Sequence, residues 1–229
     1  MGRLSAPGPA LAELDEDLLR DRVAELYTGF TSVPAEDLHF EIGRGLATAL
    51  GYSPTDLGLV PDTAADAFAG VGHHIDLADL ADGEDVLDIG VGSGTDAMIA
   101  AHRVGSGGTV VGVDPTEAQA DRTRAATEEA GVRNLSVRSG RAEALPVDDA
   151  STDVVMSNGV INLVPDKDAA FTEIARVLRP GGRVALSDIV SEQPIGARAR
   201  CNVNLWAECV AGAEPLDDYL DAIAAAGLS

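Results

Sequence analysis

The stretch VLDIGVGSGTD, residues 86–96, decides how the rest of the chain is interpreted. It begins with a short apolar run that is typical of a buried strand, and its glycines at positions 90, 92 and 94 predict a tight turn. The residues from Thr95 onward have helical spacing, and the first backbone N–H groups of that helix would point into the same space as the turn. A strand, a glycine turn and a helix in this order indicate a ligand site at the carboxyl end of the strand.

Outward from this motif, strands and helices alternate to the end of the chain. Strands that are separated by helices of about 10–15 residues predict a parallel sheet with helices on both faces, which is a doubly wound, Rossmann-like α/β fold. The expected strands are residues 85–90, 109–114, 135–139, 153–158 and 183–190, and the expected helices between them are 95–104, 116–130 and 167–178.

The N-terminal third indicates a helical extension instead. A first helix is expected to end at Gly29, a second amphipathic stretch covers about 36–50, and 62–80 is expected to be partly helical. We therefore divide the chain into a helical segment, residues 1–80, and a ligand-binding domain, residues 81–229. The apolar positions that suggest the first helix are Leu11, Leu14, Leu18, Val23 and Leu26.

Composition excludes several classes of protein. The chain has 229 residues, of which 45% are hydrophobic, and no apolar run approaches the roughly 18–20 residues that cross a bilayer. The first ten residues lack a secretory signal and there are only two cysteines, which favours a cytoplasmic protein that does not act at a membrane. The net charge of −22 would repel phosphates, so no nucleic-acid partner is expected.

Two acidic residues help to define the ligand. Asp88 ends the first strand, and Asp114 ends the second, 20 residues after Gly94, where a carboxylate can accept the hydroxyls of a ribose. Asp88 would oppose a pyrophosphate, and Thr95 stands where a dinucleotide fingerprint has its third glycine. The pattern disfavours a dinucleotide-dependent oxidoreductase and favours a cofactor without phosphate that carries a sulfonium and an ammonium group.

Two further strand ends complete the predicted site. Residues 140–145, GRAEAL, follow the third strand and should form the wall for an adenine, with the backbone of Ala142 and the carboxylate of Glu143 as contacts. Asn158 ends the fourth strand, on the floor where the donor and the acceptor of a transferred group would meet.

Five segments together resemble the class I methyltransferases, and closely the arsenite methyltransferase group among them. They are VLDIGVGSGTD (86–96), GVDPTEAQ (112–119), SNGVINLVPDK (157–167), RVLRPGG (176–182) and LWAECVAGA (205–213). The resemblance runs from about residue 50 to the C-terminus and implies S-adenosylmethionine as cofactor. It implies cofactor contacts by Asp88, Gly90, Gly92, Asp114, Ala142 and Asn158, and Gly94 completes the glycine motif.

The resemblance is incomplete on the acceptor side. The arsenite enzymes hold the metalloid with thiolates, and only Cys209 stands at such a position here. The thiol that follows Asn158 in the family is Gly159 in this chain, and the thiol of the AGVGHH segment (69–74) falls at about Val71. Cys201 precedes Cys209 by eight residues, roughly 12 Å along a straight helix, which is too far for both thiols to chelate one atom. We therefore expect poor methylation of trivalent arsenic.

Three functions stay open. The first is an arsenite-type methyltransferase. The second is a methyltransferase that modifies an oxygen, nitrogen or carbon atom of another small molecule. The third is a cofactor-binding domain without catalytic activity. A soft acceptor needs no general base, whereas an oxygen or nitrogen acceptor does. One of the adjacent histidines His73 and His74 is the candidate for that base, and we choose His73. Cys209, His73 and Asn158 are thus the candidate catalytic residues, and no metal cofactor is expected.

The C-terminal end raises one more expectation. Class I methyltransferases usually complete a seven-stranded sheet with a hairpin, yet the sequence predicts only five strands, so we expect the C-terminal strands to be missing. Residues 183–190 would then form an unpaired edge, flanked by helices at 194–210 and 216–226. Because an apolar edge strand invites pairing, we expect either a homodimer or a shortened form of a longer protein.

Overall fold

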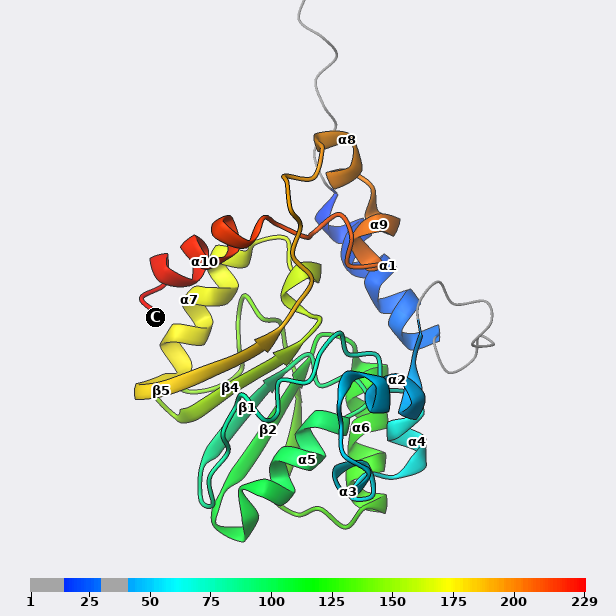
Figure 1. Cartoon of the computed structure of the whole chain (residues 1–229), viewed down its shortest axis with the longest axis vertical. Helices are drawn as coiled ribbons and strands as arrows, with labels where there is room; N and C mark the ends of the chain where they lie inside the picture. Colours follow the sequence, from blue (N-terminus) through cyan, green and yellow to red (C-terminus); the bar gives the residue numbers. More distant parts are fainter. Residues whose placement is uncertain (1–14, 30–40) are drawn as a thin grey trace, which may run out of the picture.

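Five parallel strands form one sheet in the order β3-β2-β1-β4-β5 (Figure 1). The computed structural model describes residues 15–29 and 41–229. All five expected strands are present, which confirms the doubly wound α/β fold. Their bounds are β1 Asp85–Ile89, β2 Thr109–Asp114, β3 Leu135–Ser139, β4 Thr152–Asn158 and β5 Leu178–Ser187.

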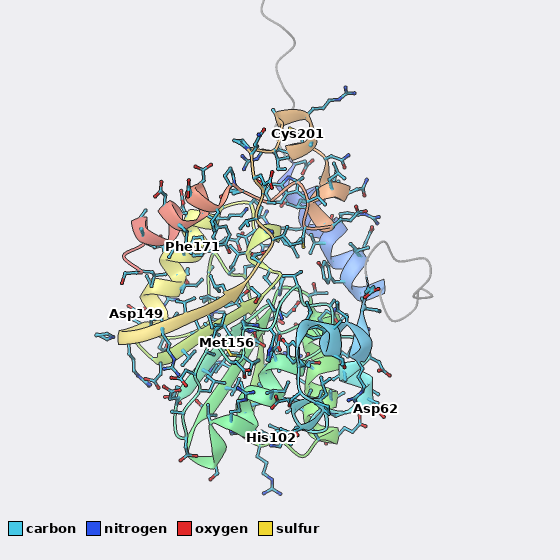
Figure 2. The ribbon with its side chains drawn as sticks, viewed as in Figure 1. Asp62, His102, Asp149, Met156, Phe171 and Cys201 are labelled. Atoms are coloured by element: carbon cyan, nitrogen blue, oxygen red, sulfur yellow. The ribbon has the colours of Figure 1, made fainter. Side chains whose placement is uncertain are left out.

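Alternate residues of each strand face the two helical layers, and both layers are apolar. One layer holds α5 (Thr95–Arg103) and α6 (Glu117–Glu129), which pack with Val86 and Val154 of the sheet. The other holds α7 (Lys167–Val177) and α10 (Leu216–Ala225), which pack with Leu87 and Val155. Figure 2 labels Met156 in the first layer's core and Phe171 in the second's. The side-chain alternation of β-strands thus gives the sheet two buried faces.

The segment that precedes the sheet packs against the layer of α5 and α6. It contains α2 (Gly43–Leu50), α3 (Pro54–Leu57) and α4 (Asp62–Ala65), whose side chains share the core cluster of that layer. Helix α3 begins where Pro54 follows Ser53, whose hydroxyl accepts a hydrogen bond from the amide of Asp56 at 3.0 Å. The expected partial helicity of residues 62–80 is limited to α4, and the domain boundary at residue 80 stays a prediction.

Helix α1 (Glu16–Gly29) ends at the predicted glycine and packs against α9 (Val203–Ala207), beyond the carboxyl ends of the strands (Figure 1). Leu19 of α1, Trp206 of α9 and Ala211 form a small buried cluster there. The expected positions Leu11 and Leu14, and residues 36–40 of the second predicted helix, lie outside the described residues.

The prediction of one helix over 194–210 is wrong. Helix α8 (Ala197–Arg200) stops before Cys201, which Figure 2 shows at the far end of the molecule. The side chain of Asn202 then accepts hydrogen bonds from the amides of Asn204 and Leu205 and so begins a separate helix, α9. Cys209 follows α9 with a left-handed φ of 60°, so the two cysteines do not share one helix face.

Strand β5 is the last strand on its side of the sheet, as the sequence predicts. It pairs with β4 in parallel register from Val154 opposite Arg183 to Asn158 opposite Ser187, after a shift near Thr152. Two short 3-10 helices, η2 (Gly105–Gly107) and η3 (Ile161–Leu163), lie in the connections. None of the helices within residues 15–29 and 41–229 is long and apolar enough to cross a bilayer.

Candidate functional site

A cavity of about 340 Å³ opens at the carboxyl ends of β1, β2 and β4. The strand order reverses between β1 and β4, which is where open α/β sheets bind their ligands. The volume lies within the range of roughly 300–1,000 Å³ typical of small-molecule sites. The walls come from α1, the glycine turn after β1, the residues after β3, and the segment from Asn158 to Pro165.

The glycine turn leaves no room for side chains. Gly90 has a left-handed φ of 75°, and a Cβ on it would lie 2.2 Å from Cγ2 of Val160. Asp114 fastens the turn from the end of β2, since its Oδ2 accepts from the amide of Gly92 at 3.1 Å and its Oδ1 from that of Thr116 at 2.9 Å. Each carboxylate oxygen keeps a second lone pair for a ligand hydroxyl.

Three buried carboxylates face this cavity. Asp88, Asp96 and Asp114 are at most 8% exposed. Burial raises the pKa of Asp88 well above its ordinary value, and the nearby charges of Asp96 and Asp114 raise it further. Burial also raises the pKa of Asp114, although its two backbone hydrogen bonds act in the opposite direction. Concentrated negative charge of this kind favours a cationic ligand and opposes a pyrophosphate.

Most predicted cofactor residues meet at this cavity. Helix α5 begins just after Gly94, which is its N-terminal cap and does not belong to the described cavity lining. The predicted residues that line the cavity are Asp88, Gly90, Gly92, Asp114, Ala142, Glu143 and Asn158. Their roles toward a cofactor stay predictions.

The other two catalytic candidates lie behind the lining. His73 stacks on the ring of Tyr52, with centroids 4.3 Å apart, and its Nδ1 lies 4.0 Å from Oδ2 of Asp76. Cys209 is 7% exposed, and its Sγ lies 3.6 Å from the carbonyl oxygen of Gly159 and 3.7 Å from the hydroxyl of Tyr27. Burial raises the pKa of the Cys209 thiol to about 11, so the group is protonated at neutral pH.

The three positions at which the family resemblance predicts thiols, Val71, Gly159 and Cys209, come together although they are far apart in the sequence. A Cβ on Gly159 would lie 3.2 Å from Cγ1 of Val71, and the Gly159 carbonyl is within hydrogen-bonding reach of Cys209. Val71, Gly159 and Cys209 therefore form one corner beside the cavity. Only one of them carries a thiol.

Sequence reasoning missed two parts of the site. Helix α1 covers the cavity with Leu19, Val23 and Tyr27, and the amide of Gln119 on α6 donates to the carbonyl of Tyr27 at 2.8 Å. Asp96 ends the same motif that contains Asp88 and lines the cavity, but it was not among the predicted site residues. The amphipathic pattern of α1 was visible, whereas the face that it covers was not.

The methyltransferase domain family matches residues 80–227, and the chain belongs to that family. The family implies S-adenosylmethionine as methyl donor. The buried acidic lining fits the positive charge of that cofactor, and the free lone pairs of Asp114 fit a ribose.

Two kinds of relative share this domain. An arsenite methyltransferase from Halobacterium salinarum is 36% identical over 91% of this chain and 56% of its own length. A nocamycin O-methyltransferase from Saccharothrix syringae is 39% identical over 57% of this chain and 47% of its own. Among solved structures, an arsenic(III) S-adenosylmethionine methyltransferase from Chlamydomonas reinhardtii superposes with a TM-score of 0.61 and 33% identity, covering 81% of this chain and 62% of that one. The chain thus spans about half the length of these curated relatives.

Proposed function

We propose that this chain binds S-adenosylmethionine and transfers its methyl group to a small acceptor in the same cavity. The observation that carries the proposal is the set of buried carboxylates Asp88, Asp96 and Asp114 around a glycine turn. When bound, the cofactor supplies an electrophilic methyl group on a sulfonium. A reducing, cytoplasmic setting is part of the proposal, because two cysteines in 229 residues are too few for a disulfide scaffold.

The chain's own residues would act by holding and orienting. Asp114 accepts the ribose hydroxyls while it fastens Gly92, and Asp88 attracts the cationic end of the cofactor. Ala142 and Glu143 border the adenine. Methyl transfer is an in-line displacement, so fixed positions of donor and acceptor supply most of the rate enhancement.

For the acceptor, the corner of Val71, Gly159 and Cys209 argues against efficient use of trivalent arsenic. A metalloid held by one thiolate can rotate and dissociate, whereas two or three thiolates would fix it for in-line attack. We therefore favour an apolar small molecule methylated at oxygen, nitrogen or carbon. The resemblance to an O-methyltransferase that acts on nocamycin is consistent with that choice.

His73 is a poor base for such an acceptor unless the 70–74 segment moves, because it lies behind Tyr52 and outside the described cavity lining. An acceptor that loses its proton before binding, or that has no proton to lose, needs no general base in the site. The choice of acceptors for testing should include phenolates and enolates for that reason.

The cofactor is tested by isothermal calorimetry. S-adenosylmethionine and its demethylated product should bind at low micromolar affinity, and NAD should not. Asp114→Ala should weaken binding by about 1.5–3 kcal/mol through the loss of charge-assisted hydrogen bonds. Asp121→Ala, an exposed acid of α6 paired with Arg124, is the matched control and should have no effect. Tight binding of NAD would refute the assignment.

The acceptor is tested by mass spectrometry of products formed from labelled cofactor. Arsenite with glutathione should give little methylated arsenic, and Val71→Cys, which adds a thiol to the corner with Cys209, should increase the yield. Efficient methylation of arsenic by the unmodified chain, abolished by Cys209→Ser, would refute the choice of acceptor. Binding of the cofactor without turnover of any acceptor would favour the non-catalytic alternative.

A further inference from the structure

The side-chain amide of Asn158 is fully used inside the protein. Its Oδ1 accepts from the backbone amides of Val71 at 2.8 Å and Gly72 at 3.2 Å. Its Nδ2 lies 3.0 Å from the carbonyl oxygen of Gly72, 3.1 Å from Oδ2 of Asp96 and 3.2 Å from the hydroxyl of Tyr52. Two N–H groups and one carbonyl thus serve five partners, which leaves little capacity for a cofactor.

Asp96 and Tyr52 fix the orientation of the Asn158 amide through its Nδ2. The hydroxyl of Tyr52 donates to Oδ1 of Asp96 at 2.5 Å, so the Asp96 carboxylate is held with its second oxygen toward Nδ2 of Asn158. Tyr52 is 2% exposed and packs edge-on against Phe68 at 5.1 Å between centroids. A carboxylate can only accept hydrogen bonds, so it selects the amide's donor side and turns Oδ1 toward the loop.

The loop itself is pressed against the strand ends. A Cβ on Gly70 would lie 2.3 Å from Nδ2 of Asn158, and a Cβ on Gly72 would lie 2.5 Å from Oγ of Ser187. Glycines at both positions let the backbone hydrogen-bond to Asn158 of β4 and lie close to Ser187 of β5. Val71 between them is therefore directed to the corner that it shares with Gly159.

We infer that Asn158 is a positioning residue, which clamps Gly70–Gly72 to the end of β4 and thereby sets the acceptor corner, and that Asp96 and Tyr52 orient the clamp. Its effect on methyl transfer rests on the function proposed above. Gly70 lines the cavity and Val71 borders the corner, so a loosened loop would misplace the acceptor more than the cofactor.

The test compares backbone hydrogen exchange of residues 70–72 in four forms of the unliganded chain. In Asn158→Ala and Asn158→Asp, protection of the Val71 and Gly72 amides should fall roughly tenfold or more. Asn158→Asp keeps the shape but places a carboxylate against Asp96. The double variant N158D/D96N exchanges the two groups, restores an N–H···O contact between them, and should recover part of the lost protection. Simple loss of packing would give no such rescue.

The matched control is Asn134→Ala. The Nδ2 of Asn134 donates to the carbonyl oxygens of Ala101 in α5 and of Gly105 and Gly108 in the connection to β2, at the opposite end of the sheet. This variant should lower stability to a similar degree and leave protection of residues 70–72 unchanged. Unaltered protection of these amides in both single variants of Asn158 would overturn the inference.

Calorimetry and turnover separate the clamp from a direct cofactor contact. The dissociation constant for S-adenosylmethionine should change about threefold or less in Asn158→Ala, while kcat for an acceptor found in the panel falls roughly tenfold or more. A large loss of cofactor affinity with normal protection of the loop would instead make Asn158 a cofactor ligand and refute the clamp. If the unmodified chain fails to bind the cofactor, the proposed function fails, and the exchange data still decide whether the clamp exists.

Discussion

Replacing Asp88 by asparagine should stabilise the unliganded protein and weaken its binding of S-adenosylmethionine. The carboxylate is 3% exposed, and the described residues provide no hydrogen bond or basic partner for it. Two more carboxylates, Asp96 and Asp114, raise its pKa in addition to burial. A neutral amide of the same shape removes this unfavourable charge, so the substitution acts in opposite directions on stability and on binding of a cation.

Substitutions that relieve strain at a functional site commonly stabilise a protein by about 0.5–2 kcal/mol. In a chain of this size, that corresponds to a rise in Tm of roughly 1–8 °C. Because the pKa of Asp88 is raised in the folded state, the folded protein binds this proton more tightly than the unfolded chain does. The contribution of Asp88 to stability is therefore present at low pH and is lost as the pH rises through the folded-state pKa. The gain from Asp88→Asn should accordingly grow with pH.

The assay is thermal unfolding from pH 5 to pH 8, with and without the cofactor. Cofactor affinity should fall by about 1.5–3 kcal/mol, or roughly 10- to 150-fold. Asp153→Asn is the control of opposite sign, because Arg179 donates to that carboxylate and lowers its pKa. This variant should lose stability and bind the cofactor normally. A lower Tm for unliganded Asp88→Asn at pH 8, or unchanged cofactor affinity, would show that the acidic lining does not select the ligand.

Three other predictions concern the rest of the molecule. With a net charge of −22, the Tm should rise between about 0.1 and 1 M KCl, as the screening length falls from roughly 10 to 3 Å, and a flat response would contradict this. Iodoacetamide should modify half-buried Cys201 before Cys209, whose thiol pKa is about 11, as peptide mass spectrometry will show. If β5 pairs with a second copy, light scattering should give a dimer that a proline at Leu186 disrupts; a monomer argues against pairing.

The regular elements of the domain could be predicted because each leaves a local pattern. The expected strand 109–114 matches β2, and the expected helix 167–178 matches α7 to one residue. Asp166 explains that agreement, because its side chain accepts from the amide of Ala169 and begins the helix at a position that the sequence marks. Strand-end residues of the site, such as Asp114, could be predicted equally well, because parallel strands bring their carboxyl ends to one edge of the sheet.

Features decided by distant contacts could not be predicted. The pattern of residues 194–210 permits one helix, but Asn202 caps a second one, which packs through Trp206 against Leu19 of α1. Asp96 has the local signature of an exposed helical residue, yet Tyr52 and Asn158 hold it inside the cavity. For α9, the cap at Asn202 is a local signal that the sequence reasoning overlooked, and only the packing of Trp206 on Leu19 is distant. For Asp96, partners far along the chain override the local preference.

The donor and acceptor ends of the site differ in how the chain constrains them. At the donor end, Asp114 and the glycine turn depend on each other, because the carboxylate that would receive the ribose also holds the amide of Gly92. At the acceptor end, the Val71 side chain borders Gly159, and the Cys209 thiol lies near the Gly159 carbonyl and the Tyr27 hydroxyl. A different side chain at Val71 would therefore leave the donor end intact. Relatives that share the domain include an arsenite methyltransferase and an O-methyltransferase. We therefore expect that the corner of Val71, Gly159 and Cys209 selects the acceptor, and that substitutions there change the acceptor while cofactor binding is kept.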